Sequence, residues 1–143
     1  MNANIRNMKY GNLFLLLIIF SMESCTFSFE KKVYGEGNVY SVSVEAFTDS
    51  ISKAGVQLVD VRTPDEFKSG NIPGSVNIDV MTGHFGEEAS GLLDKSRTVA
   101  VYCRSGNRSK NAARMLSMMG YNVVELDGGY KAWSEYKKEC SYE

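Results

Sequence analysis

Short, mostly apolar runs alternate along this chain with segments of helical periodicity, and this alternation limits the folds that the chain can adopt. The runs lie at residues 39–42, 56–61, 76–78, 98–102 and 123–126. Compact apolar runs bounded by turn residues are typical of strands buried in a parallel sheet. Strands that alternate with helices form an α/β fold. The sequence therefore predicts an α/β domain with a central, mainly parallel, five-stranded sheet flanked by helices.

Four helices are predicted between these strands. They occupy residues 44–51, a brief turn that starts near residue 64, residues 109–119, and a final segment through residues 133 and 136. Ser43 is an N-cap for the first helix. Thr63, Pro64 and Glu66 form a capping box with proline at the first helical position. Residues 79–97 have no sustained period, so no long element is expected there.

The first 24 residues predict an export signal and not a part of the fold. Arg6 and Lys9 precede an unbroken apolar run at residues 13–20. Eight helical residues extend about 12 Å, which is far less than a bilayer core of about 30 Å. A short apolar run that follows positive charge and precedes small residues is typical of an export signal.

Cys25 follows the signal directly, after the small residue Ser24. It resembles the modified cysteine of a bacterial lipoprotein. This resemblance implies export, with the protein in the bacterial periplasm and anchored to a membrane by a lipid on Cys25. An ordinary cleaved signal and a short uncleaved anchor are the alternatives. Residues 25–38 are interpreted as a tether and residues 39–143 as the domain.

Composition excludes several classes of function. A formal net charge of −1 lacks the basic surface expected of a nucleic-acid-binding protein. Three cysteines and one histidine are too few and too scattered for a zinc site, so we expect no metal and no cofactor. The same count excludes a disulfide-dense scaffold. Cys140 lies in a polar tail beyond the last predicted helix, and we expect it to face solvent.

The segment that joins the 98–102 strand to the next helix carries reactive side chains. Its residues are Cys103, Arg104, Ser105, Gly106, Asn107, Arg108 and Ser109. Ligands of open α/β sheets bind at the carboxyl ends of strands, which is where Cys103 lies. Loop amides, the positive end of the following helix and two arginines all favour a thiolate, which is the nucleophilic form of cysteine. The alternative is a buried structural cysteine beside two surface arginines.

This loop resembles the active-site loop of rhodanese-like sulfurtransferases. Residues 58–67, 70–78 and 128–133 are similar to three further signatures of that family, in the same order. The resemblance implies that Cys103 takes sulfur from thiosulfate or a related small sulfur-containing anion. The resulting persulfide passes its sulfur to a thiol or to cyanide. It also implies that Arg104 meets the incoming anion and that Arg108 braces the loop.

The other motif residues have structural interpretations. Asp60 and Arg62, with Glu66 one turn on, are interpreted as a supporting charge network. Trp133 is assigned to the core, and His84 to a solvated loop.

The sequence leaves two other functions open. Related folds place a cysteine and an arginine around phosphate, but four residues separate Cys103 from Arg108, whereas those phosphatases use five. A non-catalytic binding or redox-sensing module is the second alternative.

Overall fold

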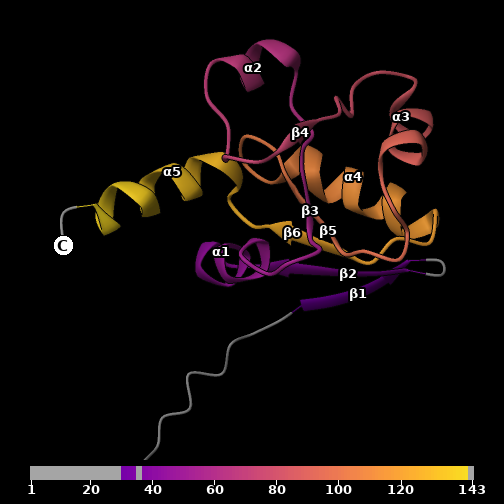
Figure 1. The fold of residues 1–143 in the computed structure, drawn as a ribbon, viewed down its shortest axis with the longest axis horizontal. Helices are drawn as coiled ribbons and strands as arrows, with labels where there is room; N and C mark the ends of the chain where they lie inside the picture. The colour runs from indigo at the N-terminus through magenta and orange to yellow at the C-terminus, as the bar shows by residue number, and fades with distance from the viewer. Residues whose placement is uncertain (1–29, 35–36, 142–143) are drawn as a thin grey trace, which may run out of the picture.

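A six-stranded sheet in the order β1-β2-β6-β5-β3-β4 forms the centre of the domain (Figure 1). The computed structural model describes residues 30–34 and 37–141. The strands are β1 (Glu30–Tyr34), β2 (Gly37–Val42), β3 (Gln57–Asp60), β4 (Val76–Asn77), β5 (Val99–Tyr102) and β6 (Val123–Leu126). The five strands from β2 to β4 in this order pair in parallel. This confirms the predicted parallel sheet.

Strand β1 adds an antiparallel edge that the sequence pattern does not predict. It lies within the segment interpreted as a tether and pairs with β2, with Lys32 opposite Val39 in the register. An edge strand needs backbone partners and no apolar period, so the residue pattern gives no signal for it. The predicted export signal and the predicted lipidation site at Cys25 lie outside the described residues.

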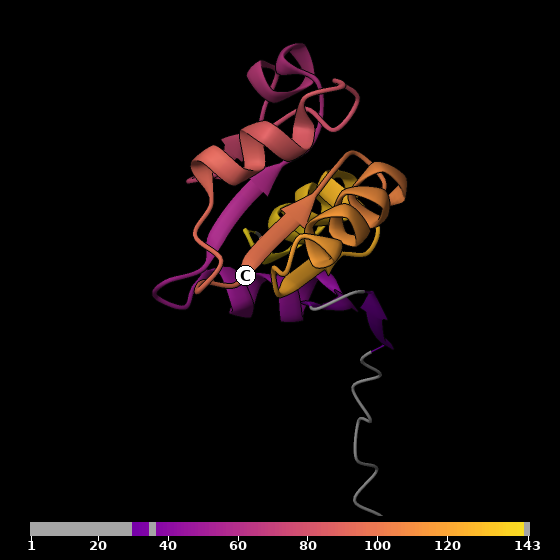
Figure 2. The same ribbon diagram turned by 90° about the vertical axis from the view of Figure 1, so that its right-hand side faces the viewer.

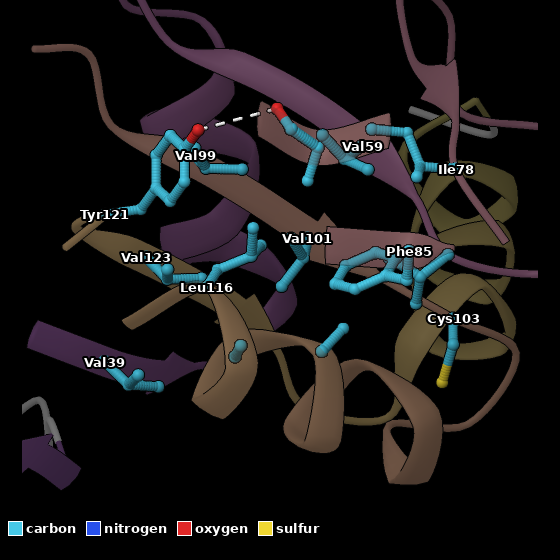
Figure 3. Close-up of a cluster of buried hydrophobic side chains, with 14 residues drawn as sticks. Val39, Val59, Ile78, Phe85, Val99, Val101, Cys103, Leu116, Tyr121 and Val123 are labelled. Atoms are coloured by element: carbon cyan, nitrogen blue, oxygen red, sulfur yellow. Dashed lines mark hydrogen bonds between the residues drawn. The ribbon is translucent and has the colours of Figure 1, made fainter. Parts of the chain in front are cut away.

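Helices cover both faces of the sheet (Figures 1 and 2). They are α1 (Val44–Ile51), α2 (Pro64–Lys68), α3 (Phe85–Leu92), α4 (Asn107–Met118) and α5 (Gly129–Cys140). Side chains of β5 alternate between two buried clusters, one packed against α3 and α4 and the other against α1 and α5. Val101 and Cys103 belong to the first cluster, which Figure 3 shows, and Tyr102 belongs to the second.

Helices α1 and α2 begin at the predicted caps. The Ser43 hydroxyl accepts from the backbone N–H of Ala46, and Thr63 and Glu66 form the reciprocal capping box. Helix α4 begins at Asn107, two residues earlier than expected. Its N-cap is Gly106, whose left-handed conformation leads directly into the helix.

One short helix was not predicted from the sequence, and one expectation about the last helix is wrong. Helix α3 forms within residues 79–97, because Phe85 and Ala89 are both buried against the sheet although two glycines weaken the local propensity for helix. Helix α5 extends through Cys140, so this residue ends the helix and does not lie in a tail beyond it. Cys140 is exposed, as expected. Within the described part of the chain, no helix is long and apolar enough to cross a membrane.

Candidate active site

Cys103 lies immediately after β5, where the strand ends and the loop to α4 begins. Its side chain is 1% exposed and closes the row of core side chains drawn in Figure 3. The Sγ atom accepts hydrogen bonds from the backbone N–H of Gly106, at 3.1 Å, and from the Ser109 hydroxyl, at 3.4 Å. The first amides of a helix lack intrahelical acceptors and present positive partial charge. The sulfur atom therefore lies where negative charge is stabilised.

Gly106 gives the loop the shape that this contact requires. Its φ of +100° lies in the left-handed region, which a residue with a Cβ rarely adopts. That conformation turns the Gly106 amide back toward Sγ and leads directly into α4. The glycine of the motif is thus required by backbone geometry.

The start of α5 packs directly on the backbone of the same loop. The amide N–H groups of Tyr130 and Lys131 donate to the carbonyl oxygens of Cys103 and Arg104, at 2.7 and 3.1 Å. A Cβ on Gly129 would lie 2.5 Å from the Cys103 oxygen. Only a glycine permits this approach, so the Gly128-Gly129 motif positions the Cys103 loop.

Arg108 bridges α4 to α2 by a bidentate ion pair with Glu66. Its two terminal nitrogens donate to the two carboxylate oxygens, each at 2.7 Å. These hydrogen bonds lower the pKa of Glu66 to about 2, against the opposing effect of burial. The same hydrogen bonds raise the pKa of Arg108. The nearby Cys103 raises it further by a smaller electrostatic effect. Arg108 therefore braces the first turn of α4, and its partner is Glu66 of the capping box.

Asp60 and Arg62 form a buried ion pair one strand away from the cysteine. Arg62 Nη2 lies 2.6 Å from Asp60 Oδ2 and also donates to the Gly70 carbonyl oxygen at 2.6 Å. The guanidinium stacks 4.4 Å above the Tyr130 ring. This pair ties the end of β3 to the loop after α2 and to α5, and Glu66 pairs with Arg108 instead of joining it.

The remaining loop side chains point outward. Arg104, Ser105 and Asn107 are exposed. Arg104 and Lys131 border an open hollow of about 370 Å³ that Arg62, Glu66, Ser69, Tyr130 and Ser134 also line. Two of its cations, Arg104 and Lys131, make no ion pair with any described residue. The hollow beside the loop therefore favours an anion.

Glu125 is a buried acid near Cys103 that the sequence analysis did not identify. It lies on β6, is 0% exposed, and its Oε1 atom lies 2.7 Å from the Ser109 hydroxyl oxygen. The sequence does contain a sign of this acid. Glu125 is a charged residue in the apolar run VVEL, and alternation along a strand places it on the same face as Val123.

Other candidate groups lie away from the loop. His84 is exposed at the start of α3 and lies 3.5 Å from Glu87. Trp133 is partly buried against the α1 and α5 side of the core. In the described part of the chain, no three His, Cys, Asp or Glu side chains are grouped to hold a metal ion.

The Glu66–Arg108 pair predicts a pH dependence of stability. Because folding lowers the pKa of Glu66 from 4.5 to about 2, the pair stabilises the fold above pH 4.5, and this is lost as the pH falls toward 2. Glu66→Gln should lower the free energy of unfolding by about 1–2 kcal/mol at neutral pH, allowing for partial exposure. Urea denaturation should show this difference shrink at about pH 3. Asp65→Asn, which changes an exposed neighbouring acid, is the control, and a pH-independent difference for Glu66→Gln would contradict the assignment.

Comparison with known proteins places this geometry in a family. A profile of the rhodanese-like domain matches residues 43–136. Thiosulfate sulfurtransferase GlpE of Shewanella oneidensis is 35% identical over 96 residues, which cover 66% of this chain and 91% of that protein. A putative mitochondrial thiosulfate sulfurtransferase of Schizosaccharomyces pombe is 36% identical over 134 residues, covering 84% of this chain and 89% of that protein.

A solved structure agrees with these matches. The rhodanese-related protein of Thermoplasma volcanium superposes with a TM-score of 0.59 at 32% identity, covering 67% of this chain and 91% of that one. The family profile spans the strand-end cysteine, its loop and the glycine pair that holds the loop. The chain therefore belongs to the rhodanese-like domain family.

Proposed function

We propose that this protein is a sulfurtransferase that carries sulfane sulfur as a persulfide on Cys103. The observation that carries the proposal is the position of Sγ, which is buried at the start of α4 and accepts hydrogen bonds from Gly106 and Ser109. Such donors stabilise a negatively charged sulfur before and after reaction. The relatives named thiosulfate sulfurtransferases support the same reaction.

In the first half-reaction, the Cys103 thiolate attacks the outer sulfur of thiosulfate or a related anion. A bond forms between Sγ and that sulfur, the sulfur–sulfur bond of thiosulfate breaks, and sulfite leaves with the bonding electron pair. The total charge of −3 is unchanged, since the persulfide retains one negative charge and sulfite carries two. The exposed cation Arg104, at the edge of the hollow, meets the donor.

In the second half-reaction, a thiolate or cyanide attacks the terminal sulfur of the persulfide. The new bond forms to that sulfur, the persulfide bond breaks, and the electron pair returns to Cys103 as the thiolate. Neither half-reaction requires a metal or an external oxidant. The same loop donors can stabilise the thiolate and the persulfide, because each carries one negative charge on sulfur.

The length of the loop favours sulfur over phosphate. Four residues separate Cys103 from Arg108, and Arg108 is already engaged in two hydrogen bonds to Glu66. A phosphate monoester needs a wider cradle for its tetrahedral oxygens and a free bidentate arginine. The phosphatase alternative is therefore less well supported.

A redox sensor that pairs Cys103 with Cys140 is also less well supported. The Tyr130 amide bonds to the Cys103 carbonyl at the start of α5, and Cys140 is the last residue of that helix. Ten residues at 1.5 Å each place Cys140 about 15 Å along the helix from Tyr130. This exceeds the distance that a disulfide spans.

Cys103→Ser should abolish sulfur transfer from thiosulfate to cyanide, because an alcohol cannot form the persulfide. Mass spectrometry of the wild-type protein after thiosulfate should show one added sulfur atom on the Cys103 peptide. Cys140→Ser is the matched control and should retain activity. A sulfur adduct on Cys140 alone, or hydrolysis of a phosphate monoester without sulfur transfer, would refute the proposal.

Arg104→Ala should lower kcat/KM for thiosulfate roughly tenfold to a hundredfold, because a charge-assisted contact contributes about 1.5–3 kcal/mol. Arg114→Ala is the control, since it removes the same charge from an exposed site on α4 where Arg114 bonds to Asn111. Steady-state assays at several salt concentrations measure both variants. Equal effects of the two substitutions would show that Arg104 acts only through net charge.

We further propose that the protein is exported and held at a membrane of the bacterial periplasm by a lipid on Cys25. The support is the order of basic residues, apolar run and small residue before Cys25. A labelled fatty acid fed to bacteria that express the full chain should enter the wild-type protein and the Cys140→Ser variant. Cys25→Ser should exclude the label and release the protein from membranes; label in that variant would contradict the proposal.

A further inference from the structure

Glu125 occupies a position in the sheet where an apolar side chain would be expected. Alternation along β6 places it on the same face as Val123, toward α4, and its partner on β5 is Val101. Both valines are fully buried in the cluster of Figure 3. Glu125 is itself 0% exposed. A buried carboxyl group at such a position costs free energy unless its oxygens are bonded.

Two serine hydroxyls bond to this carboxyl group. Ser41, which is the partner of Glu125 on β2, donates to Oε2 at 2.6 Å. The Ser109 hydroxyl oxygen lies 2.7 Å from Oε1 and also 3.4 Å from Cys103 Sγ. A single hydroxyl group therefore links Glu125 to the nucleophile.

The charged groups around Glu125 leave it without a bonded cation. Lys110 of α4 faces it, but the Lys110 ammonium donates to Asp127 at 2.6 Å. Burial raises the pKa of Glu125, and Asp127 adds to this. Hydrogen bonds from Ser41 and Ser109 and the charge of Lys110 act in the opposite direction without reversing it. These surroundings therefore favour the protonated form of Glu125 more than water does.

The Ser109 hydroxyl has one proton and three acceptors in reach, which are Glu125 Oε1 at 2.7 Å, the Gly106 carbonyl oxygen at 3.0 Å and Cys103 Sγ at 3.4 Å. An ionised carboxylate at 2.7 Å would take it as a charge-assisted bond. A protonated carboxyl group instead donates to Ser109 Oγ and leaves the Ser109 proton free for Sγ, with the Gly106 carbonyl oxygen as the other acceptor. Two buried negative charges joined by one hydroxyl also disfavour each other, so charge on one group opposes charge on the other.

We propose that Glu125 is a positioning residue that shares one proton with Cys103 through the Ser109 hydroxyl. As the S–H bond of Cys103 breaks, its proton passes to Ser109 Oγ, and the Ser109 proton passes to Glu125 Oε1. The pair carries one negative charge before and after, and no proton leaves the protein. The Gly106 amide and the start of α4 hold the charge on sulfur, while burial holds the proton on Glu125. The role of this proton in catalysis rests on the proposed function.

The test is the rate at which iodoacetamide alkylates Cys103 in the full chain, measured from about pH 5 to about pH 9. In the wild-type protein, the rate should be nearly flat near neutrality, because the position of the shared proton does not depend on pH. In Glu125→Gln, which keeps the shape and stays neutral, no carboxylate competes with sulfur for the proton, so near neutral pH the rate should be at least that of the wild type. Above this flat region the wild-type rate should rise in a second step as the pair loses its last proton, and Glu125→Gln should lack that step.

Two serine variants provide matched comparisons. Ser109→Ala breaks the link and should lack the second step, as Glu125→Gln does. Ser41→Ala removes a hydroxyl from the other carboxylate oxygen, has no contact with sulfur, and should keep the flat profile. Parallel profiles in the wild type and Glu125→Gln would overturn the inference.

A measurement on the wild-type protein does not depend on the folding of any variant. NMR of carboxyl-labelled glutamate should find Glu125 protonated at neutral pH, and alkylation of Cys103 should move its titration to lower pH. An ionised Glu125 carboxylate in the unmodified protein at neutral pH would refute the shared proton. A protein that shows the flat profile but transfers no sulfur would retain this inference and refute the proposed function.

Discussion

The contact between the start of α5 and the Cys103–Arg104 backbone holds the whole site in place. The amides of Tyr130 and Lys131 donate to the two loop carbonyls, and Gly129 permits the approach because it has no Cβ. These bonds fix the carbonyl side of the loop, so that its amide side faces Sγ. Elements that are far apart in sequence thereby set the position of one sulfur atom, and displacing the start of α5 would move the nucleophile as well.

Local signals predicted much of the fold. The Thr63–Glu66 capping box and the run that became β5 are determined by neighbouring residues, and both are present as expected. Helix α3 was missed because only Phe85 and Ala89 anchor it, and their burial depends on the sheet and not on local propensity. Strand β1 was missed because its stability comes from pairing with β2. What the sequence could not provide is the contribution of distant partners.

The same distinction applies to the site. The loop motif identified Cys103 and its neighbours, because their spacing is local. The sequence did not reveal that Arg108 pairs with Glu66, 42 positions away, or that Ser109 bonds to Glu125, 16 positions away. Asp60 and Arg62 were correctly interpreted as a charge pair, yet their link to Tyr130 became evident only in three dimensions. Glu125 was visible in the sequence as a charged residue within an apolar strand, and it was the one local indication of this network that was not recognised.

The charges around the loop divide into fixed and available groups. Arg108 is held by two hydrogen bonds to Glu66, so its positive charge stabilises the scaffold more than it attracts a donor. Arg104 is exposed and remains available to an anion. Sγ, by contrast, is bonded by the neutral donors of Gly106 and Ser109. An ionised Glu125 beside these donors would oppose negative charge on sulfur and withdraw the Ser109 proton. A neutral Glu125 removes this opposition, and for that reason a buried acid is compatible with an anionic nucleophile at the same end of the sheet.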